Sequence, residues 1–275
     1  MIGLVTDSGS MLPADLRHRF AVDVVPLTVT IDGELRHEGV DITAAEFYAR
    51  LAAGAIVTTS APSPGEFVAV YEHAARNAAS GAVSIHTGSN YSATVAAATL
   101  ANELVPIPVT IVDTRLASFP VALCVWAAGA VLADGGGADD AAAAALATAA
   151  STRSVFVVGV PELARRGGRF TTVTGKLTPT SVLELGPDGL RVTARVADVE
   201  AAIDAMVSHV ANSAEIDPLR VGVGHAERPE LAAVLIERLD AVTGVVELVP
   251  YEVGPSVGAH TGAGTIGVVY CPRRP

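Results

Sequence analysis

The sequence predicts an α/β fold of two domains, with a parallel-sheet α/β domain first and an α+β domain after it. Short apolar runs of strand length alternate with helix-length segments through the first half of the 275 residues, and this alternation is typical of a parallel sheet. After Arg153 the pattern changes, because two strand-like runs follow one another directly within residues 182–196. We therefore expect domains at residues 1–153 and 154–275, with a ligand site between them.

Local signals mark the elements of the first half. Pro13 suits the start of a helix, where its missing N–H has no partner to lose. Thr43 to Glu46 and Ser63 to Glu66 each have the pattern of a capping box that opens a helix. We expect strands at 2–6, 22–31, 83–86 and 109–112, and helices at 13–20, 43–53, 63–79, 116–133 and 141–150, with one more between the polar turn after His86 and Leu104.

The second half has shorter helices between its strands. The run 182–196 is interrupted by Pro187-Asp188-Gly189, which is typical of a turn that joins two strands. We expect the other strands at 155–160, 219–224, 245–251 and 265–270, and helices at 162–166, 199–211 and 229–239.

Composition narrows the classes of partner. The formal net charge of −11 disfavours nucleic acid and anionic membranes, and only 4% of the residues are aromatic, which disfavours base stacking. Cys124 and Cys271 lack metal-ligand spacing and fit a reducing cytoplasm. The first residues form a strand rather than a signal peptide, so we expect a cytoplasmic protein. The uncharged stretch 116–133 has about the length of a membrane span, but Pro120 and Gly129 favour a buried helix.

Three polar segments follow or interrupt strand-like runs, at residues 58–63, 86–94 and 258–264. If the fold brings them together, hydroxyls, an imidazole and backbone N–H groups converge without an obvious attacking base. Hydroxyls, an imidazole and N–H groups together can hold a small anion. The positive end of the dipole of the helix that is expected to follow the second segment would favour the anion further. The glycines around His260 would let further N–H groups point at the ligand.

Each of these residues also has a structural interpretation. Ser63 fits a helix N-cap, and Ser92 or Asn90 fits another. Thr58, Thr59 and Ser60 fit loop hydroxyls that satisfy the backbone. His86, His225 and His260 follow strands but lack a carboxylate at a supporting spacing, so we expect no metal site.

Enzymatic alternatives remain open. A hydrolase could use Ser92 and His260 with Asp7 or Asp113, although no G-x-S-x-G elbow is present. A phosphotransferase could use the Asp7-Ser8 turn, although no phosphate-binding glycine loop occurs. A structural protein with a vestigial cavity is a third alternative.

Arg165-Arg166-Gly167-Gly168-Arg169 is the basic cluster of this acidic chain. Arg165 and Arg166 fall at the predicted C-terminal end of a short helix, where the helix dipole favours positive charge. Arg169 lies beyond two glycines, and an arginine on such a turn suits contact with a carboxylate or phosphate of a partner.

Six motifs in this order together resemble the DegV family of fatty-acid-binding proteins, which includes the binding subunits of bacterial fatty acid kinase. They are Val5-Thr6-Asp7-Ser8, Val25-Pro26-Leu27-Thr28-Val29, the segment Thr59 to Phe67, Val112-Asp113-Thr114-Arg115, Gly167-Gly168-Arg169-Phe170, and the segment Gly258 to Gly264. The chain departs from the family pattern at Asn90 and Ala93, where glycines are usual, and at 178–181, where a basic, apolar segment is usual.

The resemblance implies two α/β domains that bury one long-chain fatty acid. It implies that Thr59, Ser92 and His260 hold the carboxylate, with the adjacent Ser60 and Thr261 also at the site. It further implies a separate ATP-using kinase subunit that makes an acyl phosphate, with Arg169 and Arg195 at the docking surface. On this interpretation the chain is a non-catalytic carrier that needs no cofactor or metal.

Overall fold

The computed structural model describes residues 1–77, 79–170, 173, 176–186 and 189–273. The chain forms two compact units. The first contains Met1–Thr43 and Ala55–Ala150, and the second contains Ala44–Gly54 and Ser151–Pro275. Nothing in the sequence pattern indicated that the short segment Ala44–Gly54 belongs with the second unit, and the boundary at residue 153 stays a prediction.

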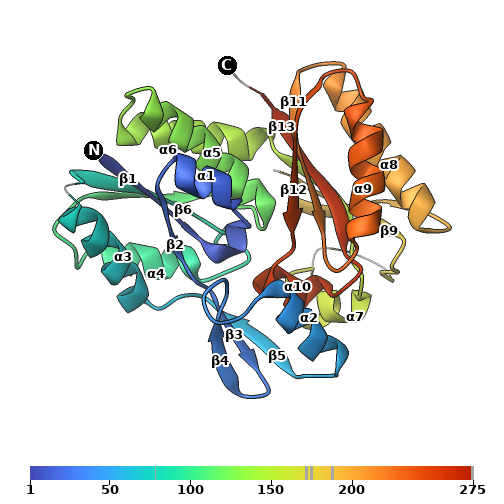
Figure 1. The fold of residues 1–275 in the computed structure, drawn as a ribbon, viewed down its shortest axis with the longest axis horizontal. Helices are drawn as coiled ribbons and strands as arrows, with labels where there is room; N and C mark the ends of the chain where they lie inside the picture. The colour runs from blue at the N-terminus through green and yellow to red at the C-terminus, as the bar shows by residue number, and fades with distance from the viewer. Residues whose placement is uncertain (78, 171–172, 174–175, 187–188, 274–275) are drawn as a thin grey trace. The chain divides into compact units, whose positions relative to one another are not determined.

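A parallel sheet lies at the centre of the first unit (Figure 1). Its strands, in spatial order, are β2 (Val22–Val25), β1 (Ile2–Asp7), β6 (Gly81–His86) and β7 (Val109–Asp113). Every neighbouring pair is parallel, so the predicted parallel α/β architecture is confirmed. The carboxyl ends of the four strands therefore meet at one edge of the sheet.

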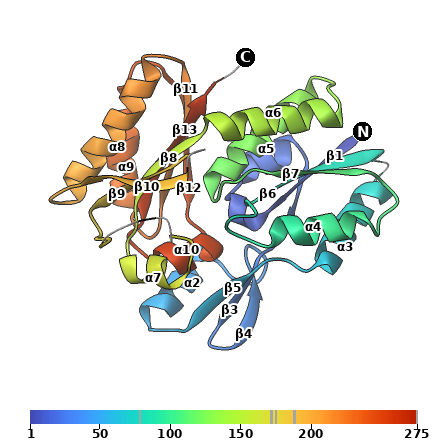
Figure 2. The ribbon, with the colours of Figure 1, turned by 180° about the vertical axis from the view of Figure 1, so that it is seen from behind.

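Helices cover both faces of this sheet (Figures 1 and 2). α5 (Phe119–Ala133) and α6 (Ala138–Ser151) pack on one face through a cluster that includes Leu4 and Ile85. α3 (Pro64–Arg76) and α4 (Thr94–Asn102) pack on the other face through a cluster that includes Val5 and Phe67. A short helix, α1 (Ala14–Arg19), follows the 3-10 turn η1 (Ser8–Ser10).

The uncharged stretch after residue 116 forms α5, and its side chains are mostly buried in the first unit, as predicted. Within the part of the chain that the structure describes, no helix has the length and apolar character needed to cross a membrane.

A small antiparallel sheet of β3 (Thr28–Ile31), β4 (Glu34–His37) and β5 (Val57–Ser60) also belongs to the first unit. The single strand predicted at 22–31 was wrong, because it divides at Pro26-Leu27 into β2 and β3, which belong to different sheets. Proline cannot donate a ladder hydrogen bond, which favours such a break. Asp32 and Gly33 both have positive φ, as a tight hairpin turn between β3 and β4 requires.

The second unit is a mixed α/β layer. Its sheet runs β10 (Gly189–Arg195), β9 (Ser181–Gly186), β8 (Arg153–Val157), β13 (Ile266–Pro272), β11 (Leu219–His225) and β12 (Val245–Glu252). β11 and β12 are parallel, and the other neighbouring pairs are antiparallel. The two strands predicted within 182–196 are therefore present, while Pro187 and Asp188 of the predicted turn lie outside the described residues.

The helices of the second unit divide into two groups. α8 (Val199–Ala214) and α9 (Pro229–Asp240) pack on the sheet around Met206 and Leu235. α10 (Pro255–Thr261) contacts both α7 (Pro161–Arg166) and α2 (Ala44–Ala52). The Tyr48 hydroxyl on α2 donates a hydrogen bond to the Val253 carbonyl at 2.8 Å, which joins the segment 44–54 to this unit.

Candidate functional site

Ser92 lies between β6 and α4, at the carboxyl edge of the parallel sheet. Its Oγ accepts the Thr94 N–H at 3.3 Å and shares a 2.7 Å hydrogen bond with the Thr94 hydroxyl. Ser92 is half-buried, whereas Thr94 is fully buried. The N-cap residue of α4 is Ala93, so the prediction that Ser92 or Asn90 is the cap was wrong. Of the two hydroxyl protons of Ser92 and Thr94, one is used between them, and the other can be donated to a ligand.

Thr59 and Ser60 lie on β5, so the prediction that residues 58–60 form a turn was wrong. Thr59 pairs with Val29 and Ser60 pairs with Thr28 in the small antiparallel sheet. Alternation along the strand separates the two side chains, because Thr59 is half-buried while Ser60 is exposed. Of this pair, Thr59 is the more enclosed hydroxyl.

His260 and Thr261 end helix α10 in the second unit. The N–H groups of Gly258 and Gly262 donate to the carbonyls of Gly254 and Gly258, both at 2.8 Å. The Gly264 N–H donates to the Ala226 carbonyl at 2.8 Å, and the Thr261 hydroxyl donates to Val257 at 3.2 Å. The predicted loop of N–H groups open to a ligand was therefore wrong, since most of this segment is a helix whose N–H groups bond within the chain.

The imidazole of His260 is seated against a glycine. A Cβ on Gly167 would lie only 2.4 Å from His260 Nδ1, so the ring packs directly against the glycine backbone. Burial, together with the nearby Arg169 charge, lowers the pKa of His260 to about 4. The ring is therefore neutral at pH 7, with one nitrogen that donates and one that accepts.

The two arginines predicted for docking are both exposed. Arg169 follows α7 on the Gly167-Gly168 turn, and its Nη1 donates to the Gly167 carbonyl. Arg195 is the last residue of β10. Arg169 thus lies on the same turn that seats His260, and both docking roles stay predictions.

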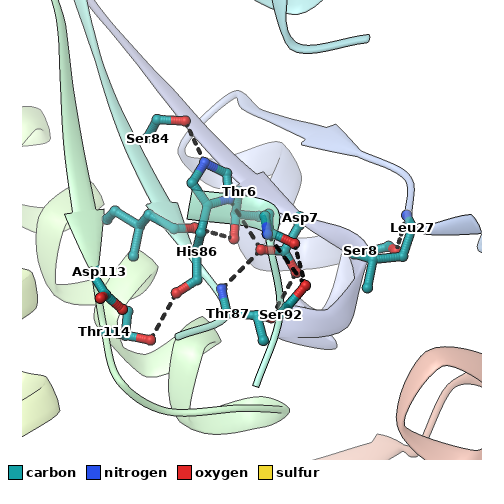
Figure 3. A network of polar contacts seen from close by, with 12 residues as sticks. Thr6, Asp7, Ser8, Leu27, Ser84, His86, Thr87, Ser92, Asp113 and Thr114 are labelled. Atoms are coloured by element: carbon teal, nitrogen blue, oxygen red, sulfur yellow. Dashed lines mark hydrogen bonds and ion pairs between the residues drawn. The ribbon is translucent and has the colours of Figure 1, made fainter. Parts of the chain in front are cut away.

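A buried polar network occupies the ends of β1 and β6 (Figure 3). His86 Nδ1 lies 3.0 Å from Asp7 Oδ2, and His86 Nε2 lies 2.6 Å from the Ser84 hydroxyl. The Tyr71 hydroxyl donates to Ser84 at 2.9 Å. All four side chains are fully buried, and burial raises the pKa of Tyr71 to about 12.

Asp7 and His86 each stand out in the sequence, but their pairing in this network was not predicted. Ser84 and His86 are two residues apart on an otherwise apolar strand, so they project from the same face of the sheet. Buried polar groups are nearly always hydrogen-bonded, so two polar side chains on one face of a buried strand indicate polar partners on that face.

Ser84, His86 and Asp7 are connected in the same order as a hydrolase triad, but Ser84 is completely buried, and its hydroxyl is bonded to His86 and Tyr71 inside the protein. Asp7 also accepts the N–H and hydroxyl of Thr87, both at 2.9 Å. The Ser8 hydroxyl donates to Glu38 at 2.6 Å and accepts the Leu27 N–H at 2.9 Å. The residues invoked for the enzymatic alternatives therefore have structural partners.

No group of three or more His, Cys, Asp or Glu side chains suited to a metal occurs among the residues that the structure describes. Thr59 and Ser92 belong to the first unit and His260 to the second. Their joint contact with one head group stays a prediction.

Comparisons with known proteins place the chain in a family. Residues 1–273 match the model of the DegV family, described as uncharacterised proteins. A DegV domain-containing protein of Streptomyces coelicolor is 34% identical over 99% of both chains.

Solved structures are also similar to the chain, and two of them cover 99% of both chains. One, described as showing fatty acid binding of a DegV family protein from Thermus thermophilus, has a TM-score of 0.89 at 30% identity. The other, DegV of Bacillus subtilis, described as a fatty-acid-binding protein, has a TM-score of 0.91 at 26% identity. Sequence and fold agree along nearly the whole length, and the chain belongs to the DegV family.

Proposed function

We propose that this protein binds one long-chain fatty acid and has no catalytic turnover of its own. The observation that carries the proposal is the agreement with the Thermus thermophilus and Bacillus subtilis proteins, which extends over 99% of both chains in each comparison. The buried partners of Asp7 and Ser8 add support, because they occupy the groups that an enzyme would need.

The head group would be held by hydroxyls and a neutral imidazole. We assign carboxylate contacts to Thr59 and Ser92 on the first unit and to His260 on the second, with Ser60 and Thr261 next to them. A neutral imidazole can donate one N–H, and a bond to a charged acceptor is stronger than one to a neutral acceptor. Thr261 contributes least, because its hydroxyl proton is already given to Val257.

The affinity would come mainly from the tail. Burial of each methylene contributes about 0.8 kcal/mol, so a long acyl chain supplies most of the binding free energy. The head group then needs enough hydrogen bonds to offset the loss of water around its charge. A general base would add nothing to such a site.

We further propose that the protein presents the carboxylate to a separate ATP-dependent kinase subunit, which forms an acyl phosphate. Arg169 and Arg195 would contact this partner, because both are exposed and can pair with acidic groups. Arg169→Ala and Arg195→Ala should then abolish acyl phosphate formation with a bacterial fatty acid kinase subunit while fatty acid binding is kept. Loss of binding itself would assign the arginines to the lipid site instead.

Mass spectrometry of an organic extract of the purified protein tests the central proposal, followed by titration with hexadecanoate. Ser92→Ala and His260→Ala should each weaken binding roughly tenfold or more, because a hydrogen bond to a charged group contributes about 1.5–3 kcal/mol. Ser208→Ala and His18→Ala are matched controls at exposed sites. A protein that is empty and takes up no hexadecanoate contradicts the proposal, and ester hydrolysis lost in Ser92→Ala would favour the hydrolase.

A further inference from the structure

Residues 87–93, which we call the Ser92 segment, are held on the side of β1 by Asp7. The Asp7 carboxylate accepts the Thr87 N–H on Oδ2 and the Thr87 hydroxyl on Oδ1, each at 2.9 Å. Asp7 is fully buried and Thr87 nearly so. The first residue of the segment is thus fixed through both its backbone and its side chain (Figure 3).

Asp7 is itself held in place by a chain of donors. The Tyr71 hydroxyl donates to Ser84, the Ser84 hydroxyl shares a hydrogen bond with His86 Nε2, and His86 Nδ1 donates to the Asp7 carboxylate. With the two bonds from Thr87, the Asp7 carboxylate accepts three hydrogen bonds.

A second carboxylate holds the segment on the side of β7. Asp113 Oδ1 accepts the Ser89 N–H at 3.0 Å and the Arg115 N–H at 3.1 Å, and Oδ2 accepts the Ser89 hydroxyl at 2.6 Å. Burial raises the pKa of Asp113, but the hydrogen bonds from Ser89 and Arg115 outweigh it, so its pKa is lowered. Asp113 is the β7 counterpart of Asp7.

The Ser92 segment is also packed closely against the segment after β7. A Cβ on Gly88 would lie 2.5 Å from the Arg115 Cα, and the Gly88 N–H donates to the Leu116 carbonyl at 2.7 Å. The Asn90 amide donates to the Arg115 carbonyl at 3.4 Å. Arg115 has a φ of 58°, an uncommon value for a residue with a side chain, and its N–H bond to Asp113 helps to maintain that conformation.

We propose that Asp7 and Asp113 are positioning residues that grip the Ser92 segment from its two flanking strands and so aim the Ser92 hydroxyl at a bound carboxylate. This inference rests on the proposed fatty acid binding. Neither acid contacts the ligand, because each carboxylate already accepts three hydrogen bonds from the protein. The two acids act only through the segment that they hold.

Asp113 offers the sharper test, because it is partly exposed and can be changed without opening the core. In Asp113→Asn the amide oxygen can still accept the Ser89 and Arg115 N–H groups, which bond Oδ1 in the wild type. Asp113→Ala removes the acceptor of both hydrogen bonds. Affinity is measured for hexadecanoate and for 1-hexadecanol, which has the same tail and an uncharged head. Amide hydrogen exchange of Ser89 to Thr94 is measured in parallel, and Asp139→Ala on α6 is the exposed control.

We expect Asp113→Ala to weaken hexadecanoate binding about tenfold, to leave 1-hexadecanol binding within about twofold, and to speed exchange in the Ser92 segment. Asp113→Asn should stay within about threefold of the wild type for both lipids. Equal weakening for both lipids would indicate a general structural role and overturn the proposal. Tighter hexadecanoate binding by Asp113→Asn would show that the charge of Asp113 acts on the ligand directly, and would also overturn it.

A wild-type protein that binds neither lipid overturns the proposed function, but it does not test whether Asp7 and Asp113 hold the Ser92 segment. In that case hydrogen exchange alone tests whether Asp113 holds the Ser92 segment in place. Exchange that is equally fast in the wild type and Asp113→Ala overturns it, while protection that is lost only in Asp113→Ala supports it.

Discussion

The two units hold their candidate head-group residues by different physical means. In the first unit, the segment that carries Ser92 is fixed by hydrogen bonds to Asp7 and Asp113. In the second unit, His260 is fixed by close packing against Gly167, on a helix whose glycine N–H groups bond within the chain. Hydrogen-bonded positions are sensitive to the loss of a partner, whereas packed positions are sensitive to added volume.

The largest expected effect concerns the buried network of the first unit. His86→Ala removes a donor to the buried Asp7 carboxylate, and the free energy of unfolding should fall by about 3 kcal/mol or more. Ser84→Ala leaves Tyr71 and His86 without their shared partner and should lower it by about 1–3 kcal/mol. Chemical denaturation measures both values.

Exposed positions provide the controls for this prediction. His18→Ala on α1 and Ser80→Ala before β6 change exposed side chains and should alter the free energy of unfolding by less than about 0.5 kcal/mol. If Ser84→Ala were as stable as Ser80→Ala, the hydrogen-bonded network would contribute nothing to the first unit, and the comparison between the units would fail.

The second unit should respond to volume. Gly167→Ala adds a methyl group where only 2.4 Å separates its Cβ from His260 Nδ1, so the ring must move. We expect a stability loss of about 1–3 kcal/mol from overpacking, together with weaker hexadecanoate binding. Gly167 has a φ of −69°, a value that alanine adopts without strain, so the effect would come from packing alone.

Gly168→Ala is the matched control for Gly167→Ala. The neighbouring glycine has a φ of +68°, and no atom of the residues that the structure describes lies within 4 Å of its Cβ position, so alanine there introduces backbone strain without a clash with them. Gly168→Ala should therefore lower stability by about 1 kcal/mol and leave lipid binding unchanged. Similar loss of binding in both variants would show that backbone conformation, and not the packing of His260, determines the site.

Features that depend on local sequence patterns could be predicted, whereas features that depend on contacts between distant residues could not. The parallel strands and the capping box of Ser63 and Glu66 follow from local patterns, and the structure has them. The division at Pro26-Leu27 was missed because both halves have equally apolar strand patterns. Pro26 is the residue that indicates the break, since proline is disfavoured inside a strand. The membership of Ala44–Gly54 in the second unit depends on contacts such as Tyr48 to Val253, which are distant in the chain.

The hydrogen bonds around the candidate site residues could not be predicted from the sequence. Asp7 and His86 are 79 residues apart, and nothing local to either residue specifies the pair. The glycines near His260 indicated an open loop, because glycine is a poor helix former. Instead they serve close packing, since a Cβ on Gly258 would lie 2.4 Å from the Tyr48 hydroxyl. Tertiary packing thus overrides local preference where two segments approach most closely.

The last expected effect is the pH dependence contributed by His260, which is close to zero at pH 7 and grows only in acid. Its pKa of about 4 in the folded protein lies below the ordinary value of 6.5, so the unfolded chain binds a proton first as the pH falls. Between these two values acid therefore favours unfolding. The loss is at most about 1.4 kcal/mol for each pH unit, and less because the ring is partly exposed. His260→Gln cannot titrate, so it should lose less stability than the wild type between about pH 6.5 and pH 4.

Lipid binding sharpens this last prediction. A bound carboxylate close to His260 favours the protonated ring, so the pKa of His260 should rise when the protein is loaded with hexadecanoate and stay near its empty value with 1-hexadecanol. Titration of the imidazole by NMR measures all three states. A fall in the pKa with both lipids, as burial by the tail would cause, would place the tail, and not the head group, beside His260, and the carboxylate contact proposed for the second unit would then have to be abandoned.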